Sequence, residues 1–128
     1  MIVLASDYGL TAERIAGFNG TWLRSATLGD RKLGAVGVRI SRWVTMHGLA
    51  FNVSTMLSHF SLIVPCGIEG KGVTSLEMEL DRVVNVGEVM DRFETRFAEI
   101  FDAQLERCEG DPLAGVSDLE LDLPTFSA

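Results

Sequence analysis

Two runs near the middle of the chain alternate in side-chain size with period two, which is the pattern of β-strands. In each run, one face carries bulky apolar side chains and the opposite face carries small ones. The bulky positions are Val36, Val38 and Ile40 in the first run and Leu49, Phe51 and Val53 in the second. The small positions are Ala35 and Gly37 in the first run and Gly48 and Ala50 in the second, with Arg39 and Asn52 beyond them. We therefore expect two neighbouring strands of one sheet.

The small faces of these two strands have two possible explanations. A glycine inside a strand weakens it and often marks the close approach of a ligand or of another backbone. Two adjacent strands with matching small faces would form a shallow groove for a slim apolar ligand. Alternatively, a helix packs against the small residues. The residues alone leave both explanations open.

A cysteine lies in a tight turn soon after the second run, within the sequence Val64-Pro65-Cys66-Gly67. Proline and glycine favour a turn, so the thiol is expected at a bend and not inside a helix or strand. A lone cysteine is often only a small buried apolar side chain. A nucleophilic cysteine needs a nearby cation or a helix N-terminus that favours its thiolate, and Lys32 is a candidate for that cation.

Local signals predict further elements on either side of this centre. Before it, we expect a helix over residues 2–8 with no capping residue in front of it, a short turn over 11–16, a strand over 20–25 and a turn over 27–30. After the first strand we expect a connection over 41–46, and after the second a short helix or turn over 57–64 that leads into a strand. Trp22 is assigned to the core. Thr74 or Ser75 is expected to cap a short helix over residues 76–80.

The clearest helix in the sequence begins at Asn85. Asn85 with Glu88 three positions later resembles a capping box, and Glu88 and Arg92 have the spacing of an ion pair on one helix face. An apolar stripe with helical spacing follows, and we expect it to face the core. The stripe consists of Val86, Val89, Met90, Phe93, Phe97, Ile100, Phe101 and Leu105.

Several other residues have both a functional and an ordinary explanation. Arg39, Arg42 and Trp43 form either a solvated loop or a docking surface for an acidic carrier protein. His47 is expected to be a hydrogen-bonded core histidine, and a single histidine without a nearby partner makes no metal site. The run from residue 67 to 72 is glycine-rich but is no phosphate loop, because its lysine, Lys71, is not followed by Ser or Thr. We interpret it as a mobile loop beside the cysteine.

Charge and cysteine content restrict the class of protein. The formal net charge is −7, mainly from residues 106–128, which argues against non-specific binding to nucleic acid. A chain of 128 residues is long enough for one domain at most. No run is long enough to span a membrane, and the start of the chain does not resemble a signal peptide. With no export signal, Cys66 and Cys108 are expected to be reduced thiols in the cytoplasm, and nothing favours a disulfide between them.

Five short motifs occur in an order that resembles the octanoyltransferase family of lipoate biosynthesis, also called lipoate-protein ligase B. They are the Arg-Lys pair before the first strand, Gly-Val-Arg within it, His-Gly-Leu-Ala in the second strand, the Pro-Cys-Gly turn and the Thr-Ser-Leu helix start. Lys32 and Cys66 are 34 positions apart, as the corresponding residues of that family are. The resemblance covers roughly residues 2–105.

The resemblance implies an acyltransferase that moves an octanoyl group from acyl carrier protein to the lysine of a lipoyl domain. The acceptor would be a lipoyl domain of a 2-oxoacid dehydrogenase or the glycine cleavage H protein. Cys66 would carry the acyl group as a thioester, and Lys32 would favour the thiolate and shuttle protons. The family contacts the acyl chain through backbone that corresponds to Ala35, Val36 and Gly37 and to Gly48, Leu49 and Ala50. No cofactor, metal, nucleic acid or membrane is implied.

The resemblance also implies a fold and a domain organisation. We expect an α+β domain with a mixed or antiparallel sheet and helices on one side, similar to the lipoate and biotin protein ligases but truncated. Residues 1–105 would form the C-terminal part of the catalytic domain, and 106–128 an acidic, disordered tail. The Arg-Gly-Gly and Thr-Tyr-His-Gly motifs of the family are absent. One alternative is therefore a non-catalytic remnant that binds the carrier or the lipoyl domain. A second is an ATP-dependent lipoate ligase, against which Cys66 argues because that chemistry needs no thiol.

Overall fold

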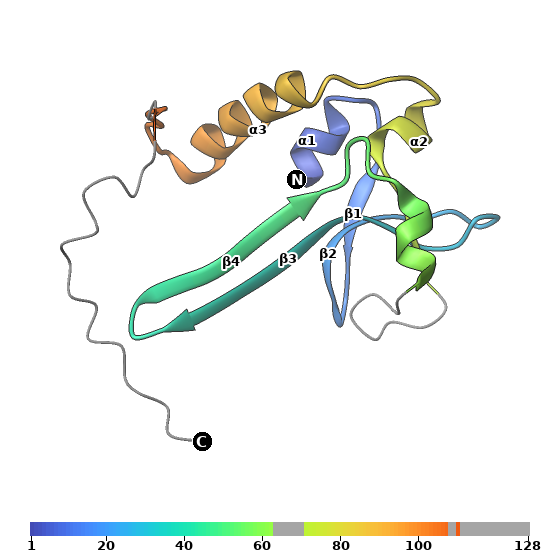
Figure 1. Cartoon of the computed structure of the whole chain (residues 1–128), viewed down its shortest axis with the longest axis horizontal. Coiled ribbons are helices and arrows are strands. Elements are labelled where there is room, and N and C mark those ends of the chain that lie inside the picture. Colours follow the sequence, from blue (N-terminus) through green and yellow to red (C-terminus); the bar gives the residue numbers. More distant parts are fainter. Residues whose placement is uncertain (63–70, 108–109, 111–128) are drawn as a thin grey trace.

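The computed structural model describes residues 1–62, 71–107 and 110. The elements in chain order are α1 (Ile2–Ser6), β1 (Ala12–Ile15), β2 (Phe18–Leu23), β3 (Arg31–Ser41), β4 (Val44–Phe51), the 3₁₀-helix η1 (Leu57–Leu62), β5 (Gly72–Val73), α2 (Leu76–Leu80) and α3 (Val86–Phe101). Helices α1 and α3 lie together on one side of the sheet (Figure 1). The α+β fold with a mixed sheet is therefore confirmed.

The sheet is antiparallel in the order β1-β2-β3-β4, and the short strand β5 runs parallel to the start of β3. The register between β3 and β4 places Ala35 opposite Ala50 and Gly37 opposite Gly48. The two runs expected to be strands are thus neighbours, and their small faces coincide.

Strands β3 and β4 are joined by a turn of only two residues. Arg42 and Trp43 occupy it with φ angles of 50° and 66°, and the ladder continues up to the pair Ser41 and Val44. The expected connection over residues 41–46 is therefore too long. Positive φ at both central residues gives a turn whose twist matches that of the two strands, so pairing persists to the tip.

The core lies between the sheet and the helices. Its buried residues are Leu4, Ala5, Leu23, Leu33, Val53, Leu76, Val84 and Val89. Trp22 is also buried, with 1% of its surface exposed, as expected, but it does not belong to this cluster. The buried tryptophan therefore packs apart from the main core, on the opposite face of the sheet from Leu23.

Helix α3 begins where the sequence predicts. The side-chain oxygen of Asn85 accepts a hydrogen bond from the backbone N–H of Glu88 at 3.2 Å, and Arg92 pairs with Glu88 at 2.9 Å. The helix ends at Phe101, because Asp102 adopts a left-handed conformation with φ 49°. The helix therefore ends before Leu105, the last residue of the stripe.

The expectation that the α3 stripe is core is wrong for most of its length. Only Val89 is buried, and Phe93 is partly buried against the core. The exposed members are Val86, Met90, Ile100, Phe101 and Leu105. Near its C-terminal end the stripe faces an open hollow of about 420 Å³, which lies between α1, α3 and the sheet. Val36 and Leu49 of the sheet line the same hollow, so the stripe faces apolar residues across an open space and does not pack on them.

Other local expectations have mixed outcomes. Helix α1 has no side-chain cap at Met1, and Ser75 caps α2 by accepting a hydrogen bond from the N–H of Met78, both as expected. Residues 12–15 form β1 and not a turn, because they pair with β2. His47 is exposed with φ 66°, so it is no core histidine. Its position in an edge strand beside Gly48 leaves its side chain without a covering layer.

Several expectations fall outside the described residues. These are the turn around Cys66, most of the glycine-rich loop, the strand expected after the 3₁₀-helix, Cys108, and all of 106–128 except residues 106, 107 and 110. Among the described residues, no helix has both the length and the apolar character needed to cross a membrane.

Candidate functional site

Lys32 lies near the start of β3, where three strands meet. It pairs with Trp22 of β2 on one side and with Val73 of β5 on the other. Its carbonyl oxygen accepts a hydrogen bond from the backbone N–H of Thr74 at 3.0 Å. The backbone of Lys32 is therefore fixed on both edges, which restricts where its long side chain reaches.

The ammonium group of Lys32 lies over the ring of Trp22, with Nζ 4.8 Å from the ring centroid. The indole is itself held: its Nε1–H donates to the carbonyl of Phe18 at 3.2 Å, and the two rings meet edge to face at 6.0 Å. Among the described residues, no carboxylate forms an ion pair with Lys32. The aromatic face thus positions this cation by a cation–π contact without neutralising its charge.

Lys71 reaches the same aromatic pair. Its Nζ lies 4.9 Å from the ring centroid of Phe18 and 5.8 Å from that of Trp22, and it is 2.5 Å from Oδ2 of Asp30. The hydrogen bond from Lys71 lowers the pKa of Asp30. Lys71 is the first described residue after 63–70, and its ammonium lies near the same indole ring as that of Lys32.

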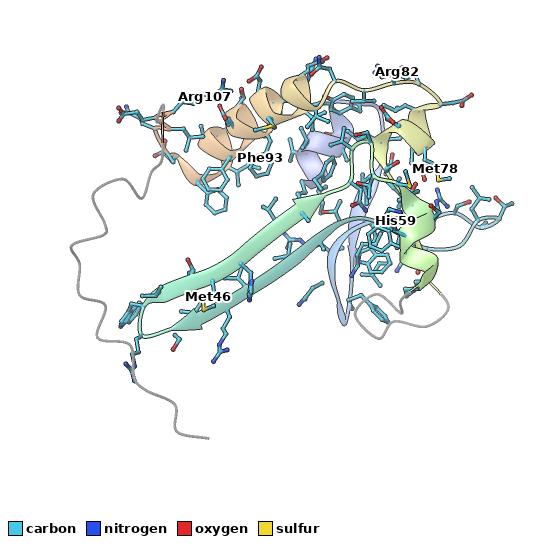
Figure 2. The ribbon with its side chains drawn as sticks, in the orientation of Figure 1. Met46, His59, Met78, Arg82, Phe93 and Arg107 are labelled. Atoms are coloured by element: carbon cyan, nitrogen blue, oxygen red, sulfur yellow. The ribbon has the colours of Figure 1, made fainter. Side chains whose placement is uncertain are left out.

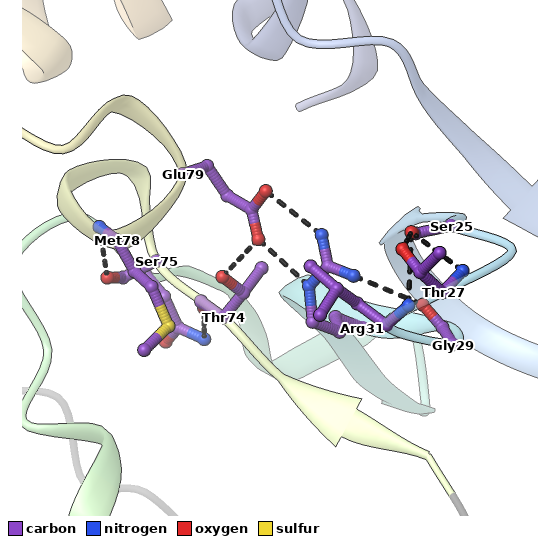
Figure 3. Close-up of polar contacts among 10 residues, drawn as sticks. Ser25, Thr27, Gly29, Arg31, Thr74, Ser75, Met78 and Glu79 are labelled. Carbon is purple, nitrogen blue, oxygen red and sulfur yellow. Dashed lines mark hydrogen bonds and ion pairs between the residues drawn. The ribbon is translucent and has the colours of Figure 1, made fainter.

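A second polar cluster anchors this strand junction (Figure 3). Arg31 donates two hydrogen bonds to the carboxylate of Glu79, at 2.9 and 3.0 Å, and the hydroxyl of Thr74 donates a third at 2.6 Å. Burial acts to raise the pKa of Glu79, but the hydrogen bonds from Arg31 and Thr74 outweigh it and lower that pKa overall. The cluster ties β3 to α2 and so holds the backbone on either side of Lys32.

The register between β2 and β3 shifts by one residue beside Lys32. Trp22 pairs with Lys32, whereas the preceding residue of β2, Thr21, pairs with Gly34. Leu33 is fully buried with the α1 residues of the core, and a Cβ added to Gly34 would lie 2.8 Å from Sδ of Met1. Both positions thus point toward α1, which leaves Lys32 and Ala35 on the opposite face of the sheet.

The small faces of β3 and β4 form a shallow, open hollow of about 470 Å³ on the sheet. Its lining consists of Ala35, Gly37, His47, Gly48, Leu49 and Ala50. A Cβ built on Gly37 or Gly48 would meet nothing within 4 Å. Val36 instead lines the hollow beneath α3, together with Leu49, which pairs with it across the β3–β4 ladder. Helices α1 and α3 lie over that other face, which leaves the small face open among the described residues.

The structure places part of the residues singled out from the sequence on one face of the sheet, and Val36 on the other. Lys32 shares the first face with Ala35 and Gly37 of β3, which line the hollow with residues of β4, while Cys66 lies outside the described residues. Trp22 and Lys71 were not expected at this site. The cross-strand pairing of Trp22 with Lys32 would have identified Trp22 as a site residue. That pairing depends on a strand register that the sequence pattern does not show. The described residues contain no cluster of three or more His, Cys, Asp or Glu side chains placed to hold a metal ion.

The amino-acid sequence matches known proteins over most of its length. Residues 1–98 match the model of the lipoyl protein ligase A/B catalytic domain. The chain is 49% identical over 107 residues to an octanoyltransferase of Christiangramia forsetii, covering 83% of this chain and 46% of that protein. It is 44% identical over 110 residues to an octanoyltransferase of Thermobifida fusca, covering 84% and 47%. The chain spans about half the length of these curated relatives.

Proposed function

Because the chain belongs to the family of lipoyl protein ligase A/B catalytic domains, we propose that it acts in octanoyl transfer for protein lipoylation. The donor is octanoyl-acyl carrier protein, the acceptor is a lysine of a lipoyl domain, and Cys66 carries the acyl group between them. The observation that carries the proposal is the placement of Lys32. Its ammonium is held on the Trp22 ring, has no carboxylate partner among the described residues, and shares a face with the open hollow.

The proposed reaction has two half-reactions. The Cys66 thiolate attacks the carbonyl carbon of the carrier thioester, a new carbon–sulfur bond forms, and the carrier thiolate leaves and takes up a proton. The amine of the acceptor lysine then attacks the acyl-Cys66 thioester, the amide bond forms, and the Cys66 thiolate leaves as the amine loses its proton. The charge of Lys32 favours the Cys66 thiolate, and its ammonium gives a proton to the departing carrier thiolate and regains one from the acceptor amine.

Chain connectivity supports a meeting of Cys66 with Lys32. Cys66 precedes Lys71 by five positions, and a fully extended segment of that length spans at most about 18 Å. Lys71 lies over the ring that also holds Lys32. The distance of the Cys66 backbone from Lys71, and therefore from the proposed cation, is limited by the length of this segment.

The open hollow of β3 and β4 suits an octanoyl chain in shape and chemistry. Gly37 faces Gly48 and Ala35 faces Ala50 across the ladder, so these four positions carry no side chain larger than a methyl group, while His47 and Leu49 complete the lining. An unbranched alkyl chain can lie flat on such a surface and gain about 0.8 kcal/mol for each methylene group removed from water. We propose that Ala35, Val36, Gly37, Gly48, Leu49 and Ala50 contact the acyl chain through their backbone.

One observation favours a second candidate, a non-catalytic module that binds the carrier or the lipoyl domain. The apolar stripe of α3 and the hollow of about 420 Å³ beneath it are open among the described residues. A surface of this kind marks a site where other protein covers the domain. On this candidate the chain would bind its partner but transfer no acyl group.

Acyl loading distinguishes the two candidates. The purified chain is incubated with octanoyl-acyl carrier protein, and the added octanoyl group is located by peptide mass spectrometry. The proposal expects the group on Cys66 in the unaltered chain and in Cys108→Ser, and expects its loss in Cys66→Ala. Acylation of Cys108, or acylation that persists in Cys66→Ala, would refute the assignment of the nucleophile. Carrier binding without any acylation would favour the non-catalytic module.

We propose the cytoplasm as the site of the reaction. A nucleophilic thiol has to be reduced, and thiols are kept reduced in that compartment.

A further inference from the structure

The β3–β4 hairpin extends from the rest of the sheet as a two-stranded arm (Figure 1). Strand β2 pairs with β3 only as far as Gly34, and beyond that point β3 pairs with β4 alone among the described strands. The arm therefore presents two free edges and a tip that the described fold does not cover.

The tip has residues that folding alone would not select. Arg42 and Trp43 both have positive φ, a conformation that Asn-Gly adopts readily and that costs a residue with a large side chain about 1 kcal/mol. Trp43 is 99% exposed, so its ring contributes no burial in return. A conformational cost without a packing gain is typical of a position retained for function.

The tip is also positively charged in an acidic protein. Arg39 and Arg42 are exposed, and neither has an ion pair among the described residues. No aspartate or glutamate occurs between Asp30 and Glu69, although the whole chain has a net charge of −7. The hairpin is therefore a positive projection with an exposed aromatic ring at its end.

We propose that Arg39, Arg42 and Trp43 form the docking surface for the acidic body of acyl carrier protein, an inference that rests on the proposed octanoyl transfer. Charge complementarity favours this occupant, and the ring supplies the apolar contact that anchors such an interface. Tip-to-tip association of two copies of this chain is disfavoured, because the two positive tips would repel each other. Nucleic acid fits poorly as well, because the net charge of the chain is strongly negative.

The position of the tip determines which kinetic constant it affects. At about 3.3 Å per residue, the ten positions from Lys32 to Arg42 place the tip roughly 33 Å from the proposed cation. The tip therefore contacts the body of the carrier and not its acyl group. Its loss should raise KM for the carrier and leave kcat unchanged.

The test measures binding of fluorescently labelled, unacylated acyl carrier protein to the 128-residue chain by anisotropy. The decisive variant is Arg42→Asn combined with Trp43→Gly, which gives the turn its preferred residues and removes the docking side chains. Its melting temperature should equal or exceed that of the unaltered chain, while the Kd for the carrier rises about tenfold or more. The double variant Arg39→Glu with Arg42→Glu should also lose binding, and binding to the unaltered chain should weaken with added salt.

Arg82→Glu is the matched control for a change of charge. Arg82 is exposed and lies in the α2–α3 connection, at the opposite end of the molecule from Met46 of the hairpin (Figure 2). The Arg82→Glu variant should bind the carrier with the same Kd as the unaltered chain. Trp43 provides a second readout, because its emission should shift to shorter wavelength on docking whereas Trp22 is already buried.

Each outcome decides between the possibilities. Loss of binding in both tip variants, with Arg82→Glu unaffected, supports the docking surface. Unchanged binding in both tip variants, an equal loss in Arg82→Glu, or no carrier binding by the unaltered chain overturns it. Tip-dependent binding without acylation of Cys66 would retain the docking surface and refute the proposed transfer, so the two failures are distinguishable.

Discussion

Lys32 and Ala35 lie on the same face of β3, although strict alternation would place residues three positions apart on opposite faces. The one-residue register shift against β2 turns both Leu33 and Gly34 toward α1, and the strand resumes its alternation from Ala35. A single irregularity thus aligns the ammonium of Lys32 with the open hollow of β3 and β4. Without it, the cation and the proposed acyl surface would be on opposite sides of the sheet.

Replacing Lys32 with methionine removes the charge and keeps most of the side chain. We expect the pH profile of iodoacetamide labelling at Cys66 to move to higher pH, because the thiolate loses a nearby cation. The profile is measured by mass spectrometry of the labelled peptide. Lys71→Met serves as the comparison, since its charge is already paired with Asp30. An unchanged profile in Lys32→Met would assign the lysine a purely structural role.

Replacing Trp22 with leucine should affect the same profile, because the ring positions the Lys32 ammonium. Trp22→Phe keeps an aromatic face and should retain more of the influence of Lys32 on the labelling profile. Both variants lose buried volume and should lower stability by about 2–4 kcal/mol, so stability alone does not separate them. The labelling profile does: equal profiles for the two variants would contradict a positioning role for the aromatic face.

Adding a methyl group should have opposite consequences at two glycines of β3. In Gly34→Ala the new Cβ would lie 3.1 Å from the backbone oxygen of Ala50 and 2.8 Å from Sδ of Met1, so we expect a loss of about 1–3 kcal/mol. In Gly37→Ala the Cβ meets nothing within 4 Å, so the free energy of unfolding should stay the same or rise slightly. Urea unfolding of both variants checks this, and equal losses would contradict the assignment of their faces.

The cluster of Arg31, Thr74 and Glu79 should contribute to stability in a pH-dependent way. Because folding lowers the pKa of Glu79, its contribution is fully present above the unfolded pKa of roughly 4.3 and disappears as pH falls through the lower folded value. Glu79→Gln should therefore cost about 2 kcal/mol near neutral pH and flatten the acid limb of the stability curve. Urea unfolding between pH 3 and 7 tests this. A constant difference between the two proteins across that range would show that Glu79 does not titrate with folding.

Deleting residues 111–128 should change stability little. The segment has four acidic residues, one glycine and two prolines, so we expect it not to pack on the core. We expect the melting temperature, measured by circular dichroism, to stay within a few degrees of that of the full chain. A large decrease would show that the segment contacts the rest of the protein.

Local signals in the sequence were sufficient for the elements that depend on neighbouring residues. The helix cap at Asn85, the cap at Ser75 and the two alternating strands follow from hydrogen-bonding groups and side-chain periodicity within a few positions. Turn length at residues 42–43 did not follow, because an arginine and a tryptophan with positive φ carry no turn signal.

The amino-acid sequence by itself determined the family, the pairing of β3 with β4 and the small residues along their common face. Only the tertiary structure decided which residues meet: Lys32 over Trp22, Lys71 with Asp30, and a largely exposed stripe on α3. Periodicity fixes which side chains share a face of one element, because it is a property of the local backbone. It does not fix what lies opposite that face, because strand register and the packing of distant segments depend on contacts between residues far apart in the chain.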